Sequence, residues 1–348
     1  MSQSRFLFLG TGNAPSKFFE SALCRLQPVY NFHVDVLQSS AAYSALQARH
    51  GYDGLLLYNS KDGASILKDQ LASERLRWVH CFTAGVDAYL RDATIRKSDI
   101  PITNVKSAYS EHLAQFVVFA VLFFAKKAMH FRTSQRAKLW APTFVEDVKE
   151  QSILIVGYGD IGTACAKKLH GLGMTVTGVK SRPESSSDDS RQCAQICEVG
   201  QLESLLPTAD YVLNLLPLTP ATQDFFDAKL FGLMKSSAVY MNFGRGQTNN
   251  ELDLLASLKA GEIAGAVMDV FKQEPLPADS EFYSLENVFL TPHSADDTKN
   301  THDNAVRVFE QVLQSYLASK ESGPHERKPM IAGRGAALPA PQRDGMPL

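Results

Sequence analysis

The chain has 348 residues, of which 45% are hydrophobic and 21% are charged, and its formal net charge at pH 7 is −2. This length predicts about two domains, and the composition is typical of a soluble globular protein. A charge this close to zero excludes a broad basic surface, so we expect no nucleic acid and no membrane as a partner.

The N-terminus and the cysteines indicate the compartment. The apolar segment 6–9 stops at Gly10, well short of the core of a signal peptide, and is better interpreted as a buried strand. The five cysteines are an odd number and lack the paired spacing of a structural metal site. Cys193 and Cys197 lie four residues apart, but their neighbours complete no ligand set, so we expect no metal. These observations predict a cytoplasmic protein.

The first third of the chain alternates between short apolar runs and helical patterns. The predicted strands are Arg5–Leu9, His33–Leu37, Gly54–Tyr58 and Trp78–Phe82, and Ser40–His50 is one of the helices predicted between them. This alternation predicts a parallel sheet that is covered by helices.

A long apolar helix is predicted from Ser110 to Phe131, with Ser110 as its N-cap. The apolar run inside it, Leu113–Ala125, is shorter than the roughly 20 residues that a membrane span needs. Because apolar residues cover most of its circumference, we expect a buried core helix.

A second series of strands and helices begins at Gln151. Its six predicted strands are Ser152–Val156, Thr175–Val179, Tyr211–Leu215, Ala238–Asn242, Gly265–Asp269 and Val288–Leu290. Six strands with intervening helices match a doubly wound sheet. A last helix is predicted over residues 298–318, and the Pro- and Gly-rich composition of residues 322–348 predicts a disordered tail.

A glycine-rich turn between the first strand and helix of this series predicts a dinucleotide site. Gly157 permits a tight turn, Gly159 lets the backbone approach a pyrophosphate, and Gly162 lets the helix pack on the sheet. The alternative is a strand–helix turn that binds nothing. The predicted cofactor contacts at this turn are Gly157, Tyr158, Gly159, Asp160, Ile161 and Gly162.

The end of the next strand predicts which nicotinamide cofactor is used. A carboxylate that binds the ribose hydroxyls of NAD is usual there, whereas this chain has Lys180, Ser181 and Arg182. These side chains would attract a 2′-phosphate, so NADP(H) is preferred and NAD(H) stays possible. The alternative is that the two basic residues are solvated loop charges.

Three titratable or charged residues each follow a predicted strand: Arg245, Glu274 and His293. Arg245 can grip a carboxylate, His293 can exchange a proton with a neighbouring keto oxygen, and Glu274 can orient the imidazole. Any one of them alone has an ordinary structural interpretation, but together they predict catalytic residues. The backbone N–H groups of Gly85 and Val86 are further candidates for binding a substrate carboxylate.

Over about residues 50–318 the sequence resembles the D-isomer-specific 2-hydroxyacid dehydrogenase family. Arg245, Glu274 and His293 match the family's catalytic Arg, Glu and His. The glycine turn matches its cofactor fingerprint, and residues 84–87 match its substrate loop. Further matches, which imply cofactor contacts, are Leu216, Pro217, Thr222 and Asp269.

The resemblance implies two doubly wound parallel-sheet domains, with a Rossmann cofactor domain inserted into a discontinuous, flavodoxin-like substrate domain. The expected boundaries are 1–104 plus 294–321 for the substrate domain and 105–293 for the cofactor domain. The resemblance also implies a homodimer through the Rossmann domains. Trp140 would reach a partner's active site or be an ordinary core residue.

The implied activity is the interconversion of small 2-keto acids, glyoxylate or hydroxypyruvate first, and D-2-hydroxy acids by a nicotinamide-dependent oxidoreductase. Two alternatives stay open. One is a corepressor-like nucleotide-binding protein of the same fold with little turnover. The other is a dehydrogenase of the same family that acts on a different donor, such as formate or phosphite.

Overall fold

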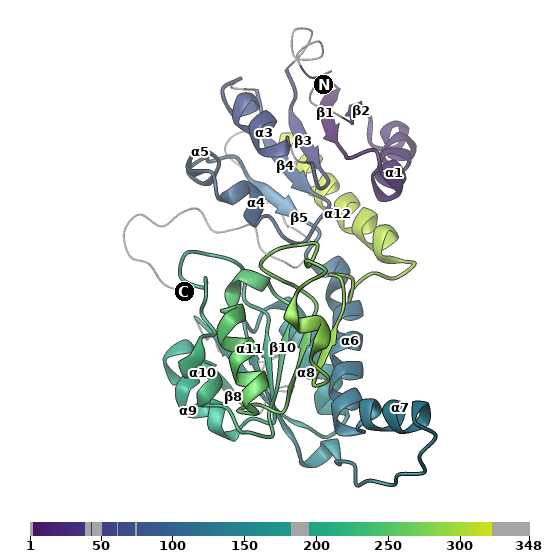
Figure 1. Ribbon diagram of the computed structural model, residues 1–348. Coiled ribbons are helices and arrows are strands. Elements are labelled where there is room, and N and C mark those ends of the chain that lie inside the picture. The colour runs from purple at the N-terminus through teal and green to yellow at the C-terminus, as the bar shows by residue number, and fades with distance from the viewer. Residues whose placement is uncertain are drawn as a thin grey trace. The chain divides into compact units, whose positions relative to one another are not determined.

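The chain folds into two compact units, which are described separately (Figure 1). One unit comprises the described residues up to Tyr109 and from Thr298 onward, and the other comprises Ser110–Asp297. The computed structural model describes residues 3–38, 43, 51–60, 62–73, 75–181 and 195–321. The tail predicted for residues 322–348 and nearly all of the helix predicted for Ser40–His50 lie outside these ranges.

The first unit is built on a parallel sheet of five strands in the order β2-β1-β3-β4-β5. This is the flavodoxin-like order, as expected. The strands are β1 Ser4–Leu9, β2 Phe32–Leu37, β3 Gly54–Leu57, β4 Trp78–Cys81 and β5 Ile102–Asn104. No strand was predicted at β5, because it is three residues long and only Ile102 in it is apolar, so it shows no apolar run.

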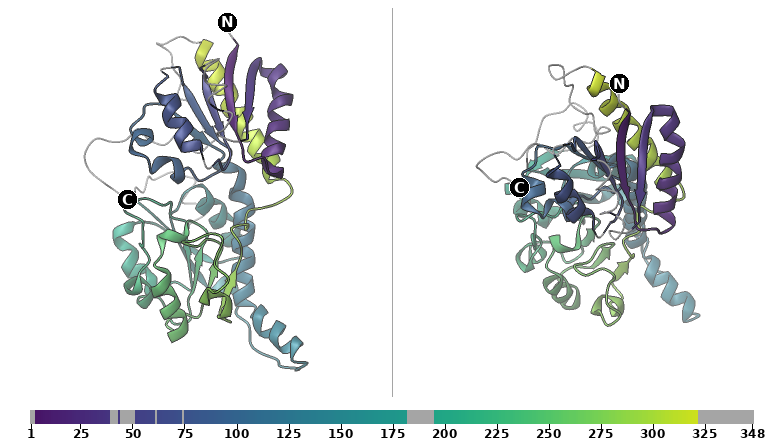
Figure 2. Two further views of the ribbon diagram at one scale, coloured as in Figure 1. Left: turned by 45° about the horizontal axis from the view of Figure 1, so that its top comes forward. Right: turned by 90° about the horizontal axis from the view of Figure 1, so that it is seen from above.

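Helices cover both faces of this sheet (Figure 2). On one face Phe19 of α1 and Phe309 of α12 pack with Trp78 of β4 in one buried cluster. The Trp78 ring also stacks on Tyr316 with 4.7 Å between centroids, so the C-terminal helix completes the N-terminal sheet. The helices of this unit are α1 Ala14–Tyr30, α3 Gly63–Leu71, α4 Asp87–Leu90, α5 Ala93–Arg96 and α12 Thr301–Glu321.

The second unit contains a seven-stranded parallel sheet in the order β12-β11-β10-β9-β6-β7-β8. Its central feature is the reversal of strand order between β6 and β9, which is the switch point where doubly wound sheets bind ligands. The strands are β6 Ser152–Val156, β7 Thr175–Lys180, β8 Gln195–Glu198, β9 Tyr211–Asn214, β10 Val239–Asn242, β11 Gly265–Met268 and β12 Val288–Leu290. The prediction of six strands omitted β8, a short edge strand with polar ends.

Together the two sheets confirm the predicted α/β class with two doubly wound parallel-sheet domains. The helices of the second unit that follow β6 are α8 Asp160–Gly171, α9 Leu202–Leu205, α10 Ala228–Gly232 and α11 Glu251–Ala260. Its short 3-10 helices are Val148–Glu150, Val199–Gln201, Leu206–Thr208, Gly246–Thr248 and Glu281–Ser284.

The long helix differs from its prediction at both ends. It runs as α6 Ser107–Ala125, and a separate helix α7 Ala128–Arg136 follows, because Lys127 adopts a left-handed conformation with φ 51°. Ser110 is therefore not the N-cap, since it lies inside α6. By length and composition α6 could cross a membrane, but half of its apolar window is buried within the molecule, as in a core helix.

Candidate active site

The candidate cofactor and catalytic residues of the second unit follow the carboxyl ends of its strands. The glycine turn follows β6, Arg245 follows β10, and Glu274 and His293 follow β11 and β12. Carboxyl ends of parallel strands share one edge of a sheet, which brings these residues to the same side of the unit.

The three glycines of the turn meet different steric demands. Gly157 has φ +95°, and a Cβ there would lie 2.8 Å from the Leu215 carbonyl carbon. A Cβ on Gly162 would lie 3.2 Å from a methyl of Ile155 in the sheet. A Cβ on Gly159 would meet no atom within 4 Å. The space beside Gly159 and the first N–H groups of α8 fit a pyrophosphate.

The side chains of the turn contact the protein itself. Tyr158 is 3% exposed, and its ring lies under the Lys180 ammonium at 5.8 Å. Asp160 accepts a hydrogen bond from the Ser110 hydroxyl, and Ile161 packs against the core of the unit. The main chain of the turn is therefore the part available to a cofactor.

The segment expected to select the cofactor is only partly described. Lys180 is the last residue of β7, and Ser181 after it is exposed. Lys180 pairs in register with Glu198 of β8, which puts an acidic residue next to the predicted anion site. Arg182 lies outside the described residues.

His293 and Glu274 form a direct pair. The Nδ1 atom of His293 lies 2.8 Å from Oε2 of Glu274, and the side chains are 46% and 37% exposed. The hydrogen bond to Glu274 outweighs partial burial and raises the pKa of His293. Burial opposes ionisation of Glu274, but the hydrogen bonds from His293 and the Phe271 N–H outweigh it and lower the pKa of Glu274. Both shifts favour the ion pair of imidazolium and carboxylate.

Asp269 anchors the loop that carries His293. Its Oδ1 accepts hydrogen bonds from the Thr291 hydroxyl at 2.7 Å, the Ser294 N–H at 2.9 Å and the Ala295 N–H at 3.1 Å. Its carbonyl oxygen accepts from the His293 N–H at 2.8 Å. These bonds hold His293 at φ 52°, a conformation that a non-glycine residue adopts only when its surroundings impose it.

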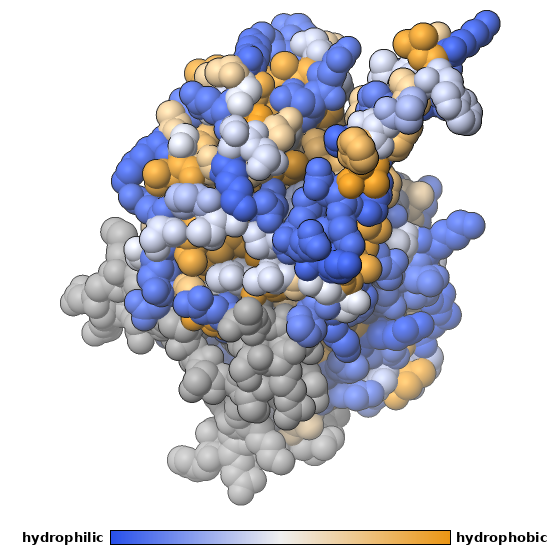
Figure 3. Space-filling model, turned by 90° about the horizontal axis from the view of Figure 1, so that it is seen from below, coloured by the Kyte–Doolittle hydropathy of each residue, from blue (hydrophilic) through white to orange (hydrophobic). Residues whose placement is uncertain are grey.

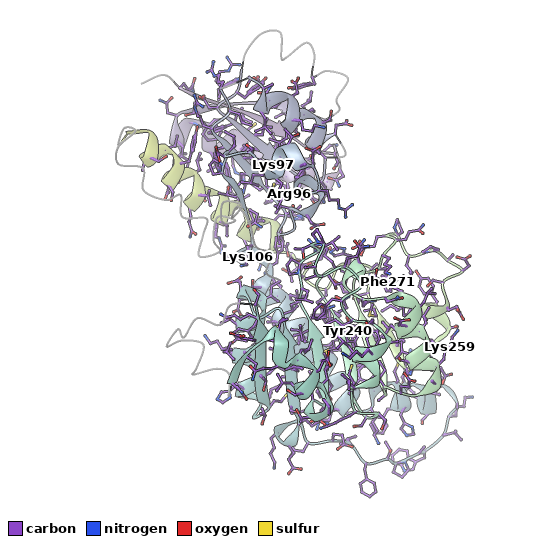
Figure 4. All side chains as sticks on the ribbon, turned by 90° about the vertical axis from the view of Figure 1, so that its left-hand side faces the viewer. Arg96, Lys97, Lys106, Tyr240, Lys259 and Phe271 are labelled. Atoms are coloured by element: carbon purple, nitrogen blue, oxygen red, sulfur yellow. The ribbon has the colours of Figure 1, made fainter. Side chains whose placement is uncertain are left out.

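Arg245 lies close enough to act on both members of this pair. Its positive charge adds to the lowering of the Glu274 pKa and partly offsets the rise in the His293 pKa, so the three residues share one electrostatic site. The Arg245 loop packs directly on the Glu274 loop, because a Cβ on Gly246 would lie 2.0 Å from the Phe271 carbonyl carbon. No role for Gly246 was predicted from the sequence. Phe271 is labelled in Figure 4.

The loop after β9 holds three predicted cofactor contacts. Leu216 is 8% exposed, and its N–H donates to Asn214 Oδ1 at 3.0 Å. The Thr222 hydroxyl donates to the Pro217 carbonyl oxygen at 2.6 Å and accepts from the Thr219 N–H at 2.8 Å. Thr222 therefore closes this loop with its own side chain.

Gly85 and Val86 belong to the first unit, in the loop between β4 and α4. Thr83 Oγ1 donates to the Gly85 carbonyl oxygen at 2.9 Å, and Asn104 Nδ2 donates to the Ala84 carbonyl oxygen at 2.6 Å. Within the described part of the chain, no hydrogen bond uses the N–H groups of Gly85 and Val86. Among the same residues there is no group of three or more His, Cys, Asp or Glu that could hold a metal.

A doubly wound domain with this glycine turn, next to an acid–base pair and an arginine, defines a dinucleotide-dependent oxidoreductase. Residues 118–295 match the family model described as D-isomer specific 2-hydroxyacid dehydrogenase, NAD binding domain. The chain belongs to the D-isomer specific 2-hydroxyacid dehydrogenase family, which confirms the resemblance seen in the sequence.

Two kinds of relative illustrate the similarity. Glyoxylate/hydroxypyruvate reductase B of Citrobacter koseri is 33% identical over 264 residues, 74% of this chain and 79% of the relative. A D-isomer specific 2-hydroxyacid dehydrogenase of Xanthobacter autotrophicus Py2, solved in complex with NADPH and MES, is 25% identical with a TM-score of 0.78, covering 91% of this chain and 96% of its own. A family protein of Aeromonas salmonicida is 29% identical with a TM-score of 0.72, covering 93% and 97%.

Proposed function

We propose that this chain is an NADPH-dependent reductase that converts small 2-keto acids, glyoxylate or hydroxypyruvate first, into D-2-hydroxy acids. The observation that carries the proposal is the His293–Glu274 pair at 2.8 Å, with the charge of Arg245 acting on both. The names of the Citrobacter relative and of the NADPH-bound Xanthobacter structure support the substrate class and the cofactor.

Each side chain of the site has a distinct task. The nicotinamide, when bound, supplies the hydride that reduces the keto carbon. Arg245 binds the substrate carboxylate and polarises the keto oxygen. His293 donates the proton to that oxygen from Nε2, because its Nδ1 is engaged by Glu274. The hydrogen bond to Glu274 raises the pKa of His293, which favours the protonated form that reduction uses.

The preference for NADP(H) rests on Lys180. Its ammonium, held over the Tyr158 ring at the end of β7, offers a charge to a 2′-phosphate. Glu198, its neighbour on β8, repels that phosphate, so NAD(H) remains a usable second cofactor. Asp269 is proposed to approach the nicotinamide end, in addition to holding the His293 loop.

Each unit is proposed to have a task of its own. The unit that ends at Tyr109 and resumes at Thr298 would be the substrate domain, and Ser110–Asp297 would be the cofactor domain. The available N–H groups of Gly85 and Val86 are proposed to bind the substrate carboxylate.

We further propose a homodimer through the cofactor domains. Helix α7 has no buried residue and stands off from the sheet of its unit (Figure 1). Trp140 and Phe144 beyond it are 98% and 92% exposed, which excludes the core position considered for Trp140. We call residues 128–144, which comprise α7 and the stretch after it, the projecting segment. Hydrophobic side chains are exposed on it at the upper right of Figure 3. A second copy would remove them from water.

The proposal is tested by following absorbance at 340 nm with purified protein, using glyoxylate, hydroxypyruvate, pyruvate and a branched keto acid, each with NADPH and with NADH. Fast oxidation of NADPH with a small keto acid is the expected result. Activity only on the branched acid would overturn the substrate assignment, and equal efficiency with NADH would overturn the cofactor preference. Tight nucleotide binding without turnover on any acid would favour the corepressor-like alternative.

A further inference from the structure

A network of buried polar side chains lies beneath the Arg245 loop. Asn214, Asn242, Thr248 and Asn249 are each 0% exposed. Asn214 Nδ2 donates to Thr248 Oγ1 and to the Tyr240 hydroxyl, both at 2.8 Å. Tyr240, labelled in Figure 4, is also fully buried. The network therefore joins the ends of β9 and β10 to the turn that follows Arg245.

Asn242 grips the main chain on both sides of the Gly244–Arg245 peptide. Its Oδ1 accepts from the Gly244 N–H at 3.0 Å, and its Nδ2 donates to the Arg245 carbonyl oxygen at 3.1 Å. Thr248 Oγ1 donates to the same carbonyl oxygen at 2.6 Å. The backbone of Arg245 is thus fixed by side chains that water does not reach, while its own side chain is only partly buried.

Asn249 supplies the last hydrogen-bond acceptor that the Asn242 amide needs. The two backbone contacts dictate which end of the Asn242 amide is oxygen and which is nitrogen, so the second N–H of that amide needs a buried acceptor. Asn249 Oδ1 provides it at 2.6 Å. The Nδ2 of Asn249 has no hydrogen-bond partner among the described residues. A buried amide with only one of its ends hydrogen-bonded contributes little to the free energy of unfolding. This points to a role for the Asn249 side chain other than stability.

We propose that Asn249 is a positioning residue, which acts through Asn242 to hold Arg245 where it binds the substrate carboxylate. The inference rests on the proposed reductase function, because the role of Arg245 comes from it. It concerns substrate binding and leaves the cofactor turn after β6 untouched.

The first test compares Asn249→Leu with Asn250→Ala. Leucine keeps the volume but removes the acceptor, and we expect the KM for the keto acid to rise about tenfold, with an unchanged Kd for NADPH. Asn250 is the matched control: it caps α11 by accepting from the Leu252 and Asp253 N–H groups and has no bond to the network. Asn250→Ala should lower the Tm and leave the KM unchanged. A purely structural role predicts that both variants lower the Tm and neither moves the KM, which would overturn the inference.

A double-mutant cycle with Arg245→Lys asks whether Asn249 acts through Arg245. If it does, Asn249→Leu should reduce kcat/KM by about tenfold in the parent protein and by less than about twofold in the Arg245→Lys protein. Equal, additive losses in the two backgrounds would show that Asn249 acts by another route.

Amide hydrogen exchange over residues 243–249 separates this inference from the proposed function. Asn249→Leu should speed exchange at Gly244 and Thr248, the latter bonded to the Arg245 carbonyl oxygen at 3.0 Å, whether or not any keto acid is reduced. Unchanged exchange would overturn the positioning role even in an active reductase. If the parent protein reduces no keto acid but the variant still exchanges faster, the proposed function is overturned. The conclusion that Asn249 holds the backbone of Arg245 would then still stand.

Discussion

The two ends of the candidate site are held very differently. At the catalytic end, buried partners fix the loops: Asn242 holds the main chain of Arg245, and Asp269 holds the His293 loop. At the cofactor-selecting end, the Lys180 ammonium lies over the Tyr158 ring at the end of β7, and Ser181 is exposed. Proton transfer needs the reacting groups placed to within a fraction of an ångström, whereas attraction of a phosphate tolerates a mobile charge. We therefore expect substitutions at the catalytic end to change reaction rates, and substitutions at the cofactor-selecting end to change the preference for NADPH over NADH.

The largest effect should come from His293→Ala. Removing the proton donor should lower kcat by about 10²- to 10⁴-fold, because general acid catalysis contributes on that order. The Kd for NADPH should stay unchanged, since the glycine turn is intact. Turnover at 340 nm and a nucleotide titration measure the two quantities. Near-normal turnover would show that another group supplies the proton.

Arg245→Ala should have the next largest effect, with kcat/KM reduced by about 10²-fold. Both a higher KM and a lower kcat are expected, because the guanidinium binds the carboxylate and polarises the keto oxygen. Arg245→Lys is the control, which should recover part of the kcat through its charge but not the two-pronged grip. A change in kcat alone would argue against a contact with the carboxylate.

Glu274→Gln should shift the pH dependence of the reaction. The carboxylate raises the pKa of His293, and an amide of the same shape does not, so the pKa of His293 falls in the variant. Reduction uses protonated His293, so the pH above which kcat/KM declines should move to lower values. A profile of kcat/KM against pH for both proteins measures the shift. An unmoved decline would mean that His293 is not the titrating group.

Lys180→Ala should have the smallest effect and the most selective one. Loss of one charge-assisted contact should lower the efficiency with NADPH by about tenfold and leave that with NADH unchanged. Lys180→Arg, which keeps the charge, serves as the control. Equal losses with both cofactors would show that the residue supports the fold of β7 rather than contacting the 2′-phosphate.

The sequence predicted most of this fold because its strands are apolar runs next to glycine turns. The strands it missed, β5 and β8, are short and partly polar, so neither shows an apolar run. The break at Lys127 has no local signal, since neither glycine nor proline marks it. Arg245, Glu274 and His293 were predicted from residue type and order, and the structure brings them together. The asparagines beneath them were not, because a buried amide looks like any polar residue until its partners are known.

The placement of the two tryptophans has a practical consequence. Trp78 is fully buried against Tyr316, whereas Trp140 is 98% exposed, and the chain has no third tryptophan. Indole fluorescence shifts to shorter wavelengths when the ring leaves water, so the emission spectrum contains two independent signals. The blue component reports whether the C-terminal helix is docked on its sheet, and the red component reports whether anything has covered the projecting segment. Replacing one tryptophan with phenylalanine would leave a single emission signal, which reports only on the surroundings of the other tryptophan.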